Sequence, residues 1–160
     1  MLDAPDRKVH ARALERARRA LGSARGLRYK LGKGGFHPED PTPSRDGFCD
    51  CSGFAAWCLG LSRDQRGRFG LWISSEGIWS DGTGPRRLFT AVVQPFPGCL
   101  VVYPDRDGRQ GHVGVVVRAI PLEGIDCSTA GLRQRPFGFF LARGSRFFAV
   151  RQGALGEAEP

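Results

Sequence analysis

The sequence predicts an α+β domain in which N-terminal helices pack on an antiparallel β-sheet from the second half of the chain. Three observations lead to this prediction. Residues 4–24 carry small apolar residues at steps of three and four, which indicates an amphipathic helix. Residues 51–58 form a short apolar run between a proline-rich loop and a glycine. From Pro95 onward, apolar runs alternate with turn sequences, which favours strands. The 160 residues suffice for one domain with a substantial core.

The first predicted element is the basic helix over residues 4–24. Residues 1–33 contain ten Lys/Arg and three Asp/Glu, so this segment holds +7 of the net charge of +8. The charged side is either a solvated helix face or a contact surface for an anionic polymer. We expect His10 to lie at the surface. Residues 1–26 are assigned to this helix as part of the domain, residues 27–151 to the body, and residues 152–160 to a flexible tail.

The stretch GFCDCSGFAAWCLG, residues 47–60, predicts a helix that starts at Cys51. A loop with three prolines (residues 36–48) precedes it, and Gly60 suits its C-terminal end. Unpaired N–H groups and the helix dipole at such a start favour a thiolate, and the small Ser52 and Gly53 leave the sulfur open. Cys51 is therefore either a reactive nucleophile of lowered pKa or a buried structural cysteine.

The β-part follows a region, residues 61–94, that gives few clear signals. The turn sequence Asp-Arg-Asp-Gly at residues 105–108 separates two apolar runs. The predicted strands cover residues 100–103, 112–119, 125–129 and 147–151. His112 stands at the mouth of the second strand, in the sequence GHVGVVV.

Four motifs follow one another in a recognisable order. They are the tyrosine-glycine segment of residues 29–35, Asp50-Cys51-Ser52-Gly53-Phe54, the Pro97-Gly98 turn, and Gly111-His112-Val113-Gly114-Val115. In this order they resemble the NlpC-type cell-wall cysteine peptidases, part of the papain-like group that also holds the CHAP amidases. The resemblance covers residues 27–130. It implies a papain-like domain that cleaves amide bonds in peptidoglycan stem peptides.

The resemblance also implies roles for individual residues. Cys51 would be the nucleophile and His112 the general base, which we prefer to His37. Tyr29 would lie beside the nucleophile and help to bind the oxyanion together with the backbone N–H of Cys51, unless it is a core aromatic residue. Asp50 and Ser52 are assigned to the same pocket. The segment Leu31-Gly32-Lys33-Gly34-Gly35 departs from the commoner pattern of the family, in which an aromatic residue precedes the paired glycines.

A third polar group should orient the imidazole. In the resembling family this group lies on the strand after the histidine strand and is often His, Asn or Gln. The corresponding residues here are Ile125-Asp126-Cys127-Ser128, so we choose Asp126, with Ser128 as the alternative. Asp126 follows His112 by 14 residues, which allows one strand, a turn and the start of an antiparallel neighbour. Ile125 and Cys127 should then face the opposite side of the sheet.

Other classes of site and partner are disfavoured. The five cysteines include no CxxC pair, so we expect reduced thiols, no metal and no other cofactor. No apolar run is long enough to span a membrane, and the first thirty residues lack a secretory signal. We therefore expect a protein that is cytoplasmic at synthesis and released by a phage, by lysis or by a specialised secretion route. The basic residues lack a nucleic-acid motif, so no nucleic acid is expected.

Two alternatives to a peptidoglycan hydrolase stay open. The same fold and thiol can act as a hydrolase or acyltransferase on another amide or ester. In the second alternative, the chain is a non-catalytic module that binds polyanions through its basic helix.

Overall fold

A six-stranded antiparallel sheet dominates the second half of the chain. The computed structural model describes residues 3–156. The sheet has the strand order β5-β10-β6-β7-β8-β9, and every neighbouring pair is antiparallel. The elements are α1 (Arg7–Ser23), β1 (Arg28–Tyr29), β2 (Phe48–Cys49), α2 (Cys51–Cys58), β3 (Asp64–Gln65), α3 (Arg66–Phe69), β4 (Leu71–Trp72), α4 (Ser75–Thr83), β5 (Phe89–Val92), β6 (Leu100–Tyr103), β7 (His112–Arg118), β8 (Glu123–Ser128), β9 (Gly131–Pro136), α5 (Gly138–Leu141) and β10 (Arg146–Val150).

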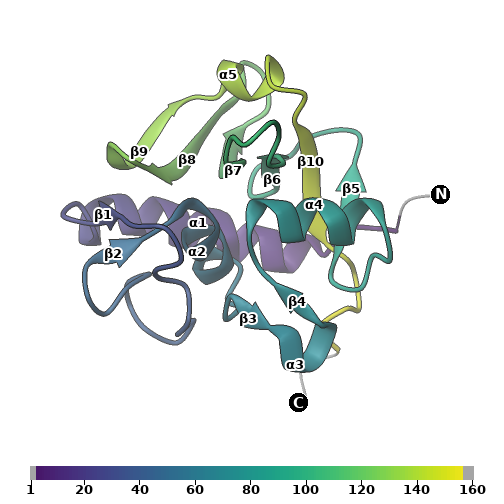
Figure 1. The fold of residues 1–160 in the computed structure, drawn as a ribbon, viewed down its shortest axis with the longest axis horizontal. Coiled ribbons are helices and arrows are strands. Elements are labelled where there is room, and N and C mark those ends of the chain that lie inside the picture. The colour runs from purple at the N-terminus through teal and green to yellow at the C-terminus, as the bar shows by residue number, and fades with distance from the viewer. Residues whose placement is uncertain (1–2, 157–160) are drawn as a thin grey trace.

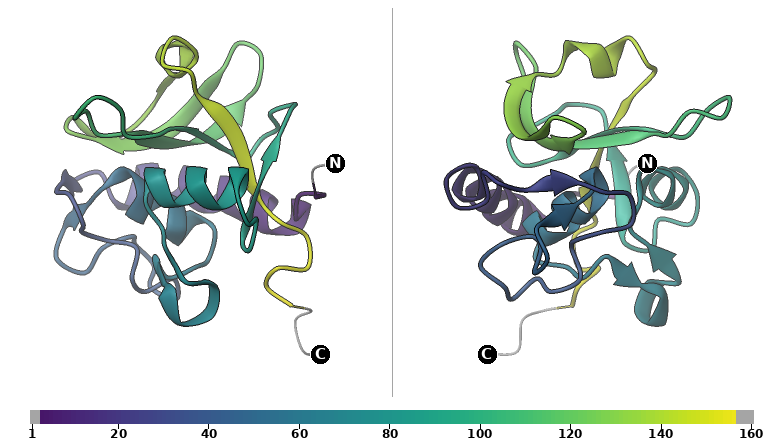
Figure 2. Two further views of the ribbon diagram at one scale, coloured as in Figure 1. Left: turned by 45° about the vertical axis from the view of Figure 1, so that its right-hand side comes forward. Right: turned by 60° about the vertical axis from the view of Figure 1, so that its left-hand side comes forward.

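The predicted α+β architecture is confirmed. Helices α1, α2 and α4 lie along one face of the sheet, whereas α5 covers the other (Figure 1). The two further views separate these layers (Figure 2). A large core lies between the helices and the sheet, and a smaller one lies under α5. Ile125 and Cys127 face the larger core, as predicted. None of the helices within residues 3–156 is long and apolar enough to cross a membrane.

The predicted basic helix is present as α1. The Asp6 side chain accepts a hydrogen bond from the N–H of Val9, which satisfies one of the free donors at the helix start. The expectation for His10 is wrong, because its side chain is fully buried. One ring nitrogen bonds to Gly98 O at 2.7 Å, and Nε2 accepts the N–H of Val150 at 2.8 Å. This places the proton on Nδ1. Burial lowers the pKa of His10 to about 4, so the ring is neutral.

The glycine-rich loop approaches α2 closely. Strands β1 and β2 pair in parallel, which sets Tyr29 beside Cys49. At Gly53 an added Cβ would come within 2.8 Å of the carbonyl oxygens of residues 33 and 34, and Gly35 has φ +78°. The glycines therefore let the loop pack directly on the helix start. Every residue of α2 is buried, so this helix is enclosed on all sides.

The structure corrects the sequence-based boundaries at two further places. Strands β5 and β9 were not predicted, and β9 forms an edge of the sheet. The tail expected to be flexible turns back through residues 152–156: Gln152 N–H donates to Ala4 O at 2.8 Å, and Leu155 packs on the core. The remaining parts of the terminal assignments, residues 1–2 and 157–160, lie outside the described residues. All five cysteines are free and buried.

Candidate active site

Cys51 is the first residue of α2, as the sequence predicts. Asp50 precedes it in an extended conformation, and its side chain accepts the N–H of Gly53 at 2.7 Å. The second oxygen of Asp50 accepts the N–H of Gly32 at 2.7 Å. The carboxylate thus fixes both the start of the helix and the glycine-rich loop, which gives Cys51 a rigid mount.

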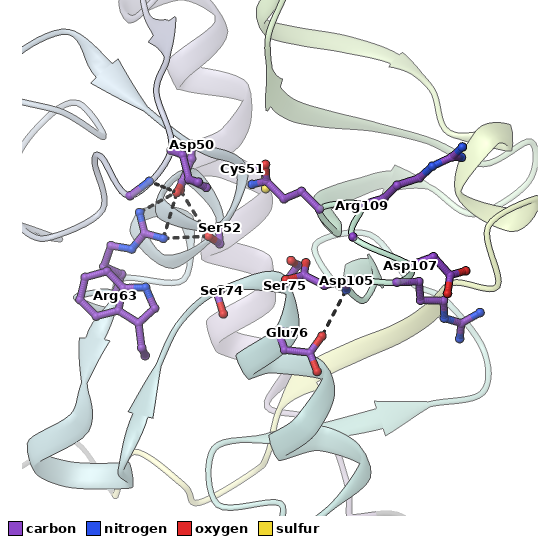
Figure 3. Close-up of a pocket in the computed structure, with 16 residues that line it drawn as sticks. Asp50, Cys51, Ser52, Arg63, Ser74, Ser75, Glu76, Asp105, Asp107 and Arg109 are labelled. Carbon is purple, nitrogen blue, oxygen red and sulfur yellow. Dashed lines mark hydrogen bonds and ion pairs between the residues drawn. The ribbon is translucent and has the colours of Figure 1, made fainter.

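A buried arginine that the sequence analysis did not predict completes this mount. Arg63 lies in a polar, arginine-rich stretch, residues 61–70, whose composition is typical of a protein surface. Its side chain is nevertheless only 1% exposed. It donates to Asp50 Oδ1 at 2.8 Å, to Asp50 Oδ2 at 3.1 Å and to Ser52 Oγ at 2.9 Å. Figure 3 shows these three residues joined on one side of Cys51. Asp50 and Ser52 border the cavity at Cys51, but their polar atoms are engaged with Arg63 and the backbone.

The structure contradicts the expectation of an open, acidic thiol. Cys51 is only 2% exposed. Burial raises the pKa of Cys51 to about 12, and the nearby Asp50 carboxylate adds to this effect. The backbone N–H groups of Val113 and Ser52 favour the thiolate but do not outweigh it. The negative N-cap therefore offsets the helix dipole, and the thiol needs an adjacent proton acceptor to ionise.

His112 lies at the start of β7, followed by Val113, whose N–H lies beside the Cys51 sulfur. Its Nε2 atom lies 2.6 Å from Asp126 Oδ2. The contact predicted between these two side chains is thus present. Ser128, the alternative, lines the neighbouring cavity, and its hydroxyl accepts the N–H of Ala130 at 3.3 Å. His37 lies instead in the loop before α2, near Glu39.

Aromatic rings hold the imidazole on its other sides. The Phe140 ring stacks on it at a centroid distance of 5.5 Å and an angle of 22°. Tyr103 and Phe139 lie at centroid distances of 6.1 and 6.5 Å. The His112 side chain is 12% exposed. Because Nε2 faces Asp126, Nδ1 is the nitrogen left for a reacting group.

The carboxylate behind the imidazole is fully buried and doubly bonded. Asp126 accepts hydrogen bonds from His112 and from Arg135, which contacts both of its oxygens. Burial by itself would raise the pKa of Asp126, but these two partners outweigh it and the pKa is lowered. Asp126 is therefore ionised at neutral pH and accepts the Nε2–H of His112.

Cys51 and His112 line two different cavities. The larger, about 590 Å³, is lined by Cys51, Arg63, Trp72, Glu76 and the turn of residues 105–110. Figure 3 shows Glu76, Asp105, Asp107 and Arg109 around it. The second, about 540 Å³, contains His112, Tyr29, Tyr103, Arg135 and Arg143.

Gln110 lines both cavities and donates to the Tyr29 hydroxyl at 2.9 Å. Tyr29 therefore lines the second cavity with its hydroxyl, while its side chain also packs against the larger core. Burial raises the pKa of Tyr29 to about 12, and Cys51 adds to the shift, so this hydroxyl keeps its proton and can donate it in a hydrogen bond.

No family model matches the chain, and neither does any curated protein.

Proposed function

We propose that this protein is a thiol-dependent hydrolase of amide bonds, with Cys51 as nucleophile, His112 as general base and Asp126 as the group that orients the imidazole. The observation that carries the proposal is the 2.6 Å contact between His112 Nε2 and the buried Asp126 carboxylate. In that contact Nε2 faces the carboxylate, so Nδ1 is the nitrogen left to accept a proton. The next residue, Val113, has its backbone N–H beside the Cys51 sulfur. A base held in one tautomer next to a stiffly mounted thiol is what nucleophilic catalysis requires.

The reaction follows in two steps. His112 Nδ1 accepts the thiol proton as the Cys51 sulfur attacks the amide carbonyl carbon. The backbone N–H of Cys51 and the Tyr29 hydroxyl are the candidate donors to the developing oxyanion. The imidazolium then protonates the leaving amine, the carbon–nitrogen bond breaks, and a thioester remains. Water, deprotonated by His112, hydrolyses the thioester and restores the thiol.

The raised pKa of Cys51 supports one version of this mechanism. The resting site holds a neutral thiol, and the thiol proton moves to His112 during attack. A preformed thiolate–imidazolium pair would require a thiol far more acidic than one enclosed in this core.

The substrate class we propose, peptidoglycan stem peptides, rests on the motif resemblance to NlpC-type peptidases and on a papain-like reading of the fold. A cavity of about 590 Å³ beside Cys51 is large enough for a peptide segment. The exposed cations of α1, among them Lys8, Arg12, Arg18 and Arg19, suit an anionic wall polymer.

Digestion of purified sacculi tests the proposal. The wild-type protein should release soluble peptide fragments, whereas Cys51→Ala should release none. Cys58→Ala, at the other end of the same buried helix, is the matched control and should retain activity. Mass analysis of the fragments identifies the bond. Equal release by wild type and Cys51→Ala would exclude the thiol mechanism. A panel of other amides and esters would identify another substrate.

A further inference from the structure

The carboxylate behind the imidazole is held from its far side by an arginine of the edge strand β9. Arg135 Nε donates to Asp126 Oδ1 at 3.0 Å, and its second donor reaches Oδ2 at 2.5 Å. The same Oδ2 atom contacts His112 Nε2. The guanidinium also lies 4.4 Å from the centre of the Phe139 ring. Arg135 thus forms a two-point contact that fixes the plane of the carboxylate.

The strand register explains why Arg135 makes this contact. Arg135 stands opposite Gly124 on β8, where no side chain competes for space between the two strands. It therefore reaches the diagonal neighbour, Asp126. Arg133 stands directly opposite Asp126 in the backbone register, but its side chain is exposed. The side chain of Arg135, by contrast, is only 26% exposed.

We propose that Arg135 is a positioning residue: it holds the Asp126 carboxylate against His112 and neutralises most of the negative charge that the imidazole faces. A buried carboxylate bonded only to an imidazole strongly favours the imidazolium. With Arg135 bound to both oxygens, Asp126 still fixes the tautomer but stabilises a proton on His112 less. The ring then remains available to accept the thiol proton. This suits a thiol that is protonated at rest, as Cys51 is.

Other groups around His112 do not substitute for Arg135. Asp126 is the only carboxylate bonded to the ring among the described residues. The titratable and charged groups facing the site are Tyr103 from β6, Arg135 from β9, Tyr29 from β1, Arg143 after α5 and Cys51 from α2. Arg143 lies over the Tyr103 ring at 5.3 Å, and no hydrogen bond joins it to Asp126.

The test measures the pKa of His112 directly and needs no substrate. NMR titration of the imidazole signals is carried out in a Cys51→Ala background, and a His37→Gln change assigns the signals. Arg135→Met should raise the pKa of His112 by about one unit. Arg135→Lys keeps the charge and should leave the pKa close to that of the parent. Arg133→Met removes the same charge from the same strand and is the matched control, with no expected shift.

The His112 pKa values of the variants decide whether the inference holds. An unchanged His112 pKa in Arg135→Met, or an equal rise in Arg133→Met, overturns the inference. If Arg135→Met does not fold, Arg135→Gln replaces it as the uncharged variant, and the same rise is required. The titration is independent of turnover, so its failure leaves the proposed function untouched.

Kinetics extends the test and rests on the proposed function. In the protein that retains Cys51, Arg135→Met should move the acid limb of the pH profile of kcat/KM to higher pH, because a protonated imidazole cannot accept the thiol proton. A role confined to stability would lower activity evenly without moving this limb. Arg135→Lys should restore the position of the limb even where kcat stays low. A limb that stays in place in Arg135→Met contradicts the inference even if kcat falls.

Discussion

Two Asp–Arg pairs with buried carboxylates belong to the candidate site, and they differ in what else their carboxylates contact. Asp50 bonds to Arg63 and to the backbone N–H groups of Gly32 and Gly53. Asp126 shares one oxygen between Arg135 and the His112 imidazole. The first pair anchors the helix start, whereas the second reaches a group that can carry a proton. Both carboxylates are buried and both bind an arginine, although Arg135 is 26% exposed and Arg63 only 1%. The additional partner of the carboxylate, backbone N–H groups or an imidazole, therefore distinguishes a structural pair from a candidate catalytic one.

The largest effect expected from this difference is on turnover at the second pair. Asp126→Ala should reduce kcat/KM by about 10²–10⁴-fold, since the imidazole loses the group that fixes its tautomer. Asp126→Asn should be milder, because the amide oxygen still accepts a hydrogen bond. Steady-state kinetics of cleavage of the substrate bond provides the measurement. Glu123→Gln on the same strand is the control, and near-full activity in Asp126→Ala would remove Asp126 from the site.

The first pair should act on stability. Arg63→Met leaves the Asp50 carboxylate buried without its cation, which should cost about 3–5 kcal/mol in the free energy of unfolding. Urea denaturation measures this loss. Arg66→Met removes a cation from an exposed ion pair three residues away and should change little. A stable, fully folded Arg63→Met protein that has lost only turnover would show that the two pairs had been assigned the wrong roles.

A smaller effect, on the pH dependence of stability, is expected from a third buried group, His10. Its pKa is about 4 in the folded protein, against the usual 6.5, so the unfolded chain binds a proton that the folded chain does not between these values. The free energy of unfolding should fall by about 1.4 kcal/mol per pH unit from pH 6.5 to 4, and this loss should end below pH 4. The lowered pKa of Asp126 acts only in a more acidic range.

Denaturant titrations between pH 7 and pH 4 test the role of His10. His10→Gln should show a flatter pH dependence than wild type, whereas the exposed His37→Gln should keep the slope. An unchanged slope in His10→Gln would contradict the assignment.

The helix start at Cys51 and the strand start at His112 could be predicted from local signals, namely an apolar run after a proline-rich loop and an apolar strand after a turn. The nearness of Asp126 was predicted from the motif resemblance and from a spacing that allows one turn. The spacing of residues 10, 13, 17 and 20 also contained the signal that His10 lies on the apolar side of α1. The two arginines could not be predicted in the same way. Arg63 and Arg135 lie in polar segments, and their partners are chosen by tertiary packing. Strand β9, with the sequence GLRQRP, lacks apolar alternation because it is a charged edge strand.

The ionisation of Cys51 shows why local rules are insufficient. The helix start suggests an acidic thiol, but an enclosed helix and a carboxylate N-cap reverse the shift. The helix start can be predicted from the local sequence, but its burial depends on tertiary packing and cannot.

Mapping the order in which the thiols react tests the central claim most directly. Cys51 lines the larger cavity, whereas the other four cysteines are fully buried. A small thiol reagent at neutral pH should therefore label Cys51 first, and His112→Ala should slow that labelling at least tenfold because the thiol loses its proton acceptor. Peptide mapping by mass spectrometry reads out both results. Labelling of another cysteine first, or a Cys51 rate that does not depend on His112, would contradict the account.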